Sequence, residues 1–387
     1  MPKLSIVIPT YNRGDLIGET LKSVQLQEFE DLEIIVVDDG STDQTEELCL
    51  RFAQEDPRIH YIPNDRKNRG PSYCRNMGVR RALGDYLIFL DSDDLLLPGA
   101  LGNRVAKMES ASEMDFLVFV GEFFQREPGD LERLWNIPLP VDPLLRFLGD
   151  DVPWQTSGPI WRRSSLAKFE EWDEAIMGCD DQDFHTRVLF SNPVFEETGE
   201  IDYAIRGAVD GREQLGQVLV TASGLKAKIA MIRNSLVRLS ALDGSRLARA
   251  RKIIAGSLLL RSVETVETHR QVNEAVQLWG LSRKKELVPF WIYFLGMVWL
   301  KNYKSFLGEI AAYYLNRFGG ADFLLKKRAQ LGTIPRSCLA SASYDGRYHR
   351  QLSFVGGAAV AVGLGKYLRS KLTLFRGHAA SVKKEKK

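Results

Sequence analysis

The chain has 387 residues, enough for one large domain and a smaller one or for two domains, and 44% of them are hydrophobic, which suffices for a sizeable core. Its four cysteines, Cys49, Cys74, Cys179 and Cys338, lack the paired spacing of zinc sites, which argues against a zinc centre or a disulfide framework and fits a reducing compartment. The N-terminal MPKLSIVIPT has the pattern of a strand rather than of a signal peptide, so we expect the chain to start in the cytoplasm.

The net charge of +2 conceals a strong asymmetry along the chain. Residues 1–210 contain 21 Lys and Arg against 40 Asp and Glu, a net charge of −19, whereas residues 211–387 contain 31 against 10, a net charge of +21. An acidic part is suited to cations and a basic part to anionic surfaces. The charge pattern therefore predicts two parts with different partners.

The first 95 residues alternate short apolar runs with amphipathic ones. Continuous β-branched runs predict buried strands at 4–9, 32–37, 59–62 and 86–90. Helical spacing of apolar residues predicts helices at 15–27, 42–54 and 72–82. This order predicts an α/β fold, with a mostly parallel sheet flanked by helices on both faces. Ligands bind such sheets at the carboxyl ends of the strands.

The pattern becomes irregular after residue 105 and changes again near residue 217. Strands are predicted at 116–120 and 158–161, and helices at 180–190, 225–242 and 246–266. Two apolar runs follow, 287–300 and 354–365, and neither reaches the 18 or so residues of a membrane span. We therefore expect a catalytic or binding domain over 1–215 and a basic, mainly helical region over 216–387.

The segment YLIFLDSDDLLLPGAL, residues 86–101, places three carboxylates directly after a predicted strand. Asp91, Asp93 and Asp94 repel one another unless something neutralises them. Carboxylates in a D-x-D arrangement suit a magnesium or manganese ion that also binds a diphosphate. An acidic turn in solvent is the alternative.

Four segments occur in the order and spacing that one sheet requires: IVIPTYNR, IIVVDDGSTDQT, NRGPSYCRNMGV and YLIFLDSDD. With these motifs the sequence resembles the family 2 glycosyltransferases, enzymes of the GT-A fold that transfer a sugar from a nucleotide-sugar with inversion. The resemblance is strong over residues 3–100 and weaker to about 210. It implies a divalent metal, magnesium or manganese, as cofactor.

The resemblance also implies a nucleotide-sugar site. Thr10 and Tyr11 correspond to the first nucleotide loop, where the aromatic ring lies against uracil; packing at a strand end is the alternative for Tyr11. Asp39 corresponds to the acceptor for the N3–H of the base. Asn68 and Arg75 belong to the third motif, and Arg75 would pair with the diphosphate or Asp93, or serve as a structural ion pair.

In the fourth motif, the resemblance makes Asp91 a contact to the ribose or the metal. Asp93 becomes the main metal ligand, and Asp94 orients its neighbours. Asp38, in the second motif, would cap the turn before the next helix. The charge that neutralises the acidic cluster would then be a divalent cation carrying a nucleotide diphosphate.

The family also has an Asp as general base 80 to 100 residues beyond the D-x-D motif. MGCDDQDFHTRVL aligns Asp181 with this base and Asp180 with the preceding glutamate, and Asp183 is a neighbouring alternative. An acidic helix N-terminus without catalytic function would show the same pattern. The remaining polar and aromatic residues of interest are His185, expected at the surface; Trp154, Trp161 and Trp172, expected in the core or against sugar rings; and Arg206 and Arg212, expected near phosphates.

The resemblance predicts a metal-dependent inverting glycosyltransferase of the hexosyltransferase type, with a nucleotide-sugar donor, here UDP-sugar, and a glycan or glycolipid acceptor in cell-surface polysaccharide or glycolipid biosynthesis. A nucleotidyltransferase and a non-catalytic nucleotide-sugar-binding module are the alternatives. The basic region 216–387 predicts peripheral contact at the inner, cytoplasmic face of the cell membrane, or else a helical bundle with solvated charges. No motif accompanies the charge that would indicate nucleic-acid binding.

Overall fold

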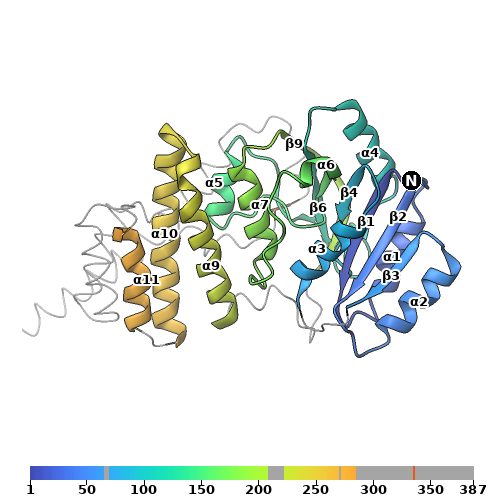
Figure 1. The fold of residues 1–387 in the computed structure, drawn as a ribbon, viewed down its shortest axis with the longest axis horizontal. Coiled ribbons are helices and arrows are strands. Elements are labelled where there is room, and N and C mark those ends of the chain that lie inside the picture. Colours follow the sequence, from blue (N-terminus) through green and yellow to red (C-terminus); the bar gives the residue numbers. More distant parts are fainter. Residues whose placement is uncertain (65–68, 208–221, 270–271, 285–333, 336–387) are drawn as a thin grey trace, which may run out of the picture.

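A computed structural model describes residues 1–64, 69–207, 222–269, 272–284 and 334–335 of the chain (Figure 1). Strands and helices alternate through the first half of the described chain and helices follow. The strands are β1 (Leu4–Thr10), β2 (Leu32–Asp38), β3 (Ile59–Pro63), β4 (Tyr86–Phe89), β5 (Leu95–Leu96), β6 (Phe116–Phe124), β7 (Arg133–Leu134), β8 (Pro159–Arg162), β9 (Phe195–Arg206) and β10 (Ile334–Pro335). The helices are α1 (Ile17–Gln25), α2 (Thr45–Glu55), α3 (Pro71–Arg81), α4 (Ala100–Ser110), α5 (Pro143–Leu148), α6 (Arg163–Leu166), α7 (Asp180–Phe190), α9 (Ala222–Arg238), α10 (Gly244–His269) and α11 (Val272–Lys284).

The described strands form one mixed sheet in the order β10-β7-β6-β8-β4-β1-β2-β3, with β9 beside β6 and β5. Strands β3, β2, β1 and β4 are all parallel, and Leu4 of β1 is opposite both Leu32 and Tyr86. Strand β8 pairs antiparallel with β4 and β6. The predicted α/β fold with a parallel sheet is therefore confirmed, and antiparallel strands extend it on the β4 side. The carboxyl ends of β1, β2 and β4 meet at one edge.

Alternate residues of the central strands enter two separate cores. Ile6 and Ile8 of β1 lie in the core beneath α1, α2 and α4, whereas Val7 lies in the core that α3 and α7 cover. The approach of α3 to the sheet is close: a Cβ at Gly78 would lie 2.2 Å from Cγ1 of Val7. Because glycine removes this obstacle, α3 packs tightly on β1 and holds its polar residues near the strand ends.

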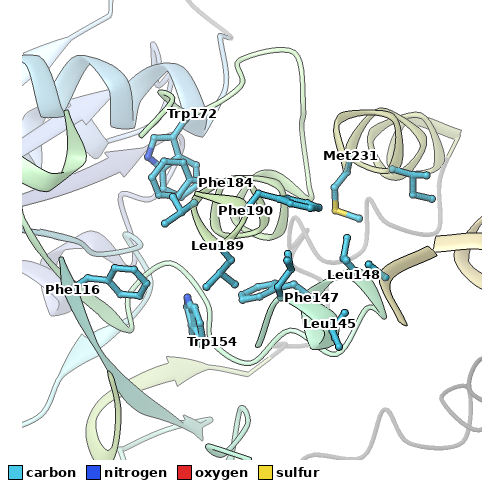
Figure 2. Close-up of a cluster of buried hydrophobic side chains, with 14 of the residues drawn as sticks. Phe116, Leu145, Phe147, Leu148, Trp154, Trp172, Phe184, Leu189, Phe190 and Met231 are labelled. Atoms are coloured by element: carbon cyan, nitrogen blue, oxygen red, sulfur yellow. The ribbon is translucent and has the colours of Figure 1, made fainter. Parts of the chain in front are cut away.

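The second of these cores is rich in aromatic side chains (Figure 2). Trp154, Trp161 and Trp172 are all buried, and Trp172 stacks on Phe184 with ring centroids 4.1 Å apart. The tryptophans are therefore core residues rather than exposed sugar platforms. His185 was expected at the surface, and this was wrong: it is buried and stacks parallel to Trp161, and burial lowers its pKa to about 3.

Most elements expected from hydrophobic patterns are present with shifted ends, and the helix expected at 180–190 is α7. The strand expected at 116–120 is longer, because β6 continues to Phe124. Helices α4 and α5 and strand β9 were not predicted. Strand β9 begins with FEETGEID, which has no continuous apolar run, and α5 has only six residues. In both cases tertiary packing stabilises an element whose local pattern is weak.

The described C-terminal elements are helical, as expected, apart from the two-residue strand β10, which pairs with β7. Helices α9, α10 and α11 lie side by side next to α5 and α7 (Figure 1), and their buried residues continue the aromatic-rich core. None of the helices in the described part has the length and apolarity needed to cross a bilayer. The runs 287–300 and 354–365 lie outside the described residues. The division at residue 215 remains a prediction.

Candidate active site

The loops after β1 and β2 are joined by hydrogen bonds. Asn12, which has a positive φ of 50°, accepts the backbone N–H of Thr42 at 2.8 Å, and its own N–H donates to Ser41 Oγ at 2.8 Å. Thr10 is buried at the strand end, and its carbonyl accepts the N–H of Asp39. Tyr11 is 43% exposed, so its ring is available to a ligand.

Asp39 holds the start of α3. Its Oδ1 accepts from Asn64 Nδ2 at 2.7 Å and from the N–H of Arg69 at 2.9 Å, and its Oδ2 accepts from the N–H of Gly70 at 2.7 Å. A carboxylate offers about four acceptor positions, and donors of the described residues fill three of those of Asp39. Asn68 lies outside the described residues.

Asp38 is engaged elsewhere, which separates the two acids of the second motif. Its Oδ1 accepts from the N–H and hydroxyl of Ser41, and its Oδ2 accepts from Tyr61 Oη at 2.7 Å. Asp38 therefore closes the turn that follows β2, whereas Asp39 faces the third motif.

The acidic cluster after β4 divides into an anchored and an accessible part. Asp94 is buried, and its Oδ2 accepts from Gln155 Nε2 at 2.6 Å and Ser157 Oγ at 2.8 Å. The same hydroxyl accepts the N–H of Asp91. The side chains of Asp91 and Asp93 remain 32% and 26% exposed. Asp94 thus holds the turn after β4 in place, whereas the carboxylates of Asp91 and Asp93 are partly exposed to solvent.

Positive charges compensate this cluster only in part. Arg13 Nε lies 3.7 Å from Asp93 Oδ2, and Arg206 Nε donates to the carbonyl of Asp93 while its Nη2 pairs with Glu19. Burial and the negative charge of Asp91 raise the pKa of Asp93 above its ordinary value. Arg212 lies outside the described residues.

Arg75 connects the acidic cluster to helix α7. Its Nη2 donates to Asp91 Oδ1 at 2.8 Å, its Nη1 donates to Asp180 Oδ2 at 2.5 Å, and its Cζ lies 4.5 Å from the centroid of the Trp172 ring. Burial disfavours the charged guanidinium, yet Asp91 and Asp180 keep the pKa of Arg75 above its ordinary value. The sequence left open whether Arg75 pairs with Asp93, a diphosphate or a structural partner. The structure places it on Asp91 and Asp180.

The two alternative bases at the start of α7 have different surroundings. Asp181 Oδ1 accepts the N–H of Gln182 at 2.7 Å, and burial together with the charge of Asp180 raises the pKa of Asp181 to about 6. Asp183 is buried, and its oxygens accept from Arg187 Nε at 2.7 Å and Asn234 Nδ2 at 3.1 Å. Asp183 is therefore a structural anchor, and the geometry favours Asp181 as a proton acceptor.

The acidic cluster offers carboxylate donors for a divalent metal ion. Within the described residues no group of three or more His, Cys, Asp and Glu side chains is arranged to hold a metal ion. Asp91 and Asp93 nevertheless supply two partly exposed carboxylates, and burial together with the negative charge of Asp91 raises the pKa of Asp93. Magnesium and manganese need only one or two protein carboxylates when phosphates supply further oxygens. The residues therefore fit a metal bound together with a diphosphate.

Comparison with known proteins bears out the resemblance in the first part of the chain. Residues 5–168 match the model of "Glycosyl transferase family 2". Over these residues the chain is similar to the family 2 glycosyltransferases. The match contains all four motifs and ends before the predicted base.

Two curated relatives illustrate the similarity. The "GalNAc(5)-diNAcBac-PP-undecaprenol beta-1,3-glucosyltransferase" of Campylobacter jejuni is 45% identical over 133 residues, which are 34% of this chain and 42% of the relative. The "Uncharacterized glycosyltransferase YibD" of Escherichia coli is 31% identical over 174 residues, 45% of this chain and 46% of the relative. The matches thus span less than half of these relatives' length.

Solved structures show the same fold. The crystal structure of S. aureus TarS has a TM-score of 0.55 and 18% identity, and covers 82% of this chain and 54% of TarS. That of TarS 1–349 in complex with UDP-GlcNAc has a TM-score of 0.55 and 20% identity, and covers 85% of this chain and 92% of the other. The expected GT-A fold is confirmed.

The pKa of Asp181 predicts the pH dependence of the reaction. A general base must be deprotonated, so kcat/KM should fall on the order of tenfold per pH unit below about pH 6. Asp180→Asn should move this acid limb to lower pH, because it removes a negative neighbour that raises the pKa of Asp181. Exposed Glu113→Gln is the matched control. An acid limb that stays in place in Asp180→Asn would contradict the assignment.

Proposed function

We propose that the chain transfers a sugar from a nucleotide-sugar, UDP-sugar above all, to an acceptor hydroxyl with inversion at the anomeric carbon. The observation that carries the proposal is the position of Arg75 between Asp91, in the cluster suited to a metal and diphosphate, and Asp180, next to the candidate base Asp181. One buried side chain thereby links the two groups that a single-displacement transfer requires.

The residues suggest how the steps are divided. Tyr11 and Asp39 bind the nucleobase of the donor. Asp91 and Asp93 would hold a divalent metal ion together with the diphosphate. A divalent cation bound there would offset the charge that develops on the leaving diphosphate. Asp181 accepts the proton of the acceptor hydroxyl while the hydroxyl oxygen attacks the anomeric carbon. The bond between the anomeric carbon and the diphosphate oxygen breaks in the same step.

Relatives support the choice of donor and acceptor classes. The Campylobacter jejuni relative is named as a glucosyltransferase acting on a sugar linked to undecaprenol through a diphosphate, and TarS 1–349 was crystallised with UDP-GlcNAc. We extend these classes to the chain as a UDP-sugar donor and a glycolipid or polysaccharide acceptor, with magnesium or manganese as cofactor.

The donor and the metal can be tested together. The wild-type protein should hydrolyse one of the UDP-, GDP- or dTDP-sugars in a manganese- or magnesium-dependent manner, and Asp93→Ala should lose both this activity and the manganese dependence of nucleotide binding by calorimetry. Thermal unfolding checks that the variant is folded. The same nucleotide affinity with and without manganese in both proteins would remove the metal function.

Asp181→Asn separates binding from chemistry. The substitution keeps the shape of the side chain but removes the base, so we expect transfer to fall about 10²–10⁴-fold while donor affinity persists. Turnover close to that of the wild type would show that the base lies elsewhere. For the wild-type protein, release of pyrophosphate from a nucleoside triphosphate as its nucleotidyl group moves to an acceptor would instead favour the nucleotidyltransferase alternative, and donor binding without turnover would favour a non-catalytic module.

The basic helices are proposed to contact the inner face of the cell membrane. Arg249, Arg251 and Lys252 of α10 are exposed, and the C. jejuni relative is named for a lipid-linked substrate. Binding to anionic vesicles should weaken with salt, because attraction is screened over about 8–10 Å at ordinary ionic strength. It should also weaken when Trp291 and Trp299, outside the described residues, are replaced by serine. Co-sedimentation with vesicles measures the effect of salt and the effect of the substitutions. If the folded protein fails to bind anionic vesicles at low salt, the membrane proposal is wrong and the helical-bundle interpretation remains.

A further inference from the structure

Helix α9 lies against the segment that carries the candidate base, although it follows the part of the chain that matches the family model (Figure 1). Ala227 of α9 packs with Ile176 and Cys179 in a small apolar cluster. Cys179 directly precedes α7. Helix α9 therefore packs against the residues that lead into the first turn of α7, which contains Asp180 and Asp181.

Lys228 makes the polar part of this contact. It is only 7% exposed, and its Nζ donates to Gln182 Oε1 and, at 2.9 Å, to Asp150 Oδ1. The other end of the Gln182 side chain donates to the carbonyl of Phe147 at 2.7 Å. Because the N–H of Gln182 donates to Asp181 Oδ1, the residue that Lys228 fixes is the one that orients the candidate base.

Asn234 makes a second contact six residues further along α9. Its Nδ2 donates to Asp183 Oδ1 at 3.1 Å and to Asp173 Oδ2 at 3.3 Å. Arg187 Nε holds the other oxygen of Asp183. Residues 182 and 183, the two that follow Asp181, are thus both bound to side chains of α9.

A helix that only covers a core does not need a buried lysine. Removing an ammonium group from water is unfavourable unless it is paired and hydrogen-bonded, and an apolar side chain would fill the same space without this cost. The partners of Lys228 are Gln182, in the first turn of α7, and Asp150, which follows α5 and also accepts from Gln182 Nε2 at 3.1 Å. This arrangement gives directional contacts where position matters for proton transfer.

We propose that α9 positions the catalytic base, with Lys228 acting through Gln182 and Asn234 acting through Asp183. The inference rests on the proposed function, because it takes Asp181 as the base. Lys228 and Asn234 are positioning residues and touch neither substrate in this scheme. Through these two side chains, α9 holds the segment of α7 that carries the candidate base.

Two substitutions test the inference in the full-length protein. Lys228→Met keeps the apolar stem and removes the ammonium group, and Asn234→Leu removes the amide. Each should lower kcat about 10–100-fold, since small displacements of a catalytic group have effects of this size, while KM for the donor and UDP affinity stay unchanged. Lys228→Arg should recover part of the lost kcat. Exposed neighbours on the same helix supply matched controls, Lys226→Met and Arg233→Leu, and these should behave as the wild type.

The outcomes separate this inference from the proposed function. If Asp181→Asn is inactive but Lys228→Met and Asn234→Leu both keep the wild-type kcat, the positioning inference alone is wrong. If both variants lose UDP affinity together with thermal stability, α9 contributes only to folding, and the inference is also overturned. Wild-type turnover in Asp181→Asn would overturn the proposed base and this inference with it.

Discussion

The buried guanidinium of Arg75 is the constraint on which the site depends. It is 3% exposed and lies between Asp91, at the end of β4, and Asp180, at the start of α7. Breaking such a buried pair by removing one partner typically costs about 3–5 kcal/mol, because the remaining charge is left unpaired. A planar guanidinium also stacks on Trp172 while it donates to both carboxylates, which a lysine could not do. The sheet edge and α7 are therefore held in one relative position.

The carboxylates around Arg75 are of two kinds. Some hold turns and helices in place, and others remain available to a ligand. Asp38 and Asp183 accept protein donors on both carboxylate oxygens, Asp94 accepts two donors on Oδ2, and all three hold turns or helices in place. Asp93 and Asp181 have raised pKa values, because burial and a neighbouring carboxylate act on each. Perturbed carboxylates of this kind collect at functional sites. Burial raises the pKa of Asp94 and Asp183 as well, so the hydrogen-bond donors on each carboxylate, rather than its pKa, separate the anchored acids from the available ones.

The sequence predicted the first half of the fold well because its strands are continuous apolar runs that end in polar motifs. Asp91 could be selected because it follows such a strand, whereas Asp181 was selected because the segment MGCDDQDFHTRVL resembles the base motif of the family. The partners could not be predicted: Arg75 meets Asp180 across 105 positions, and no local pattern encodes that distance. His185 was misassigned because a lone polar residue in a helix gives no sign of the aromatic side chains around it.

The change in charge near residue 210 does not coincide with a change in packing. Met231 of α9 shares a core with Phe190 of α7 and Leu148 of α5 (Figure 2), and Lys228 reaches back to Gln182. The sequence match to the family covers residues 5–168 and thus the nucleotide and metal motifs. The groups that support the candidate base come from beyond that match.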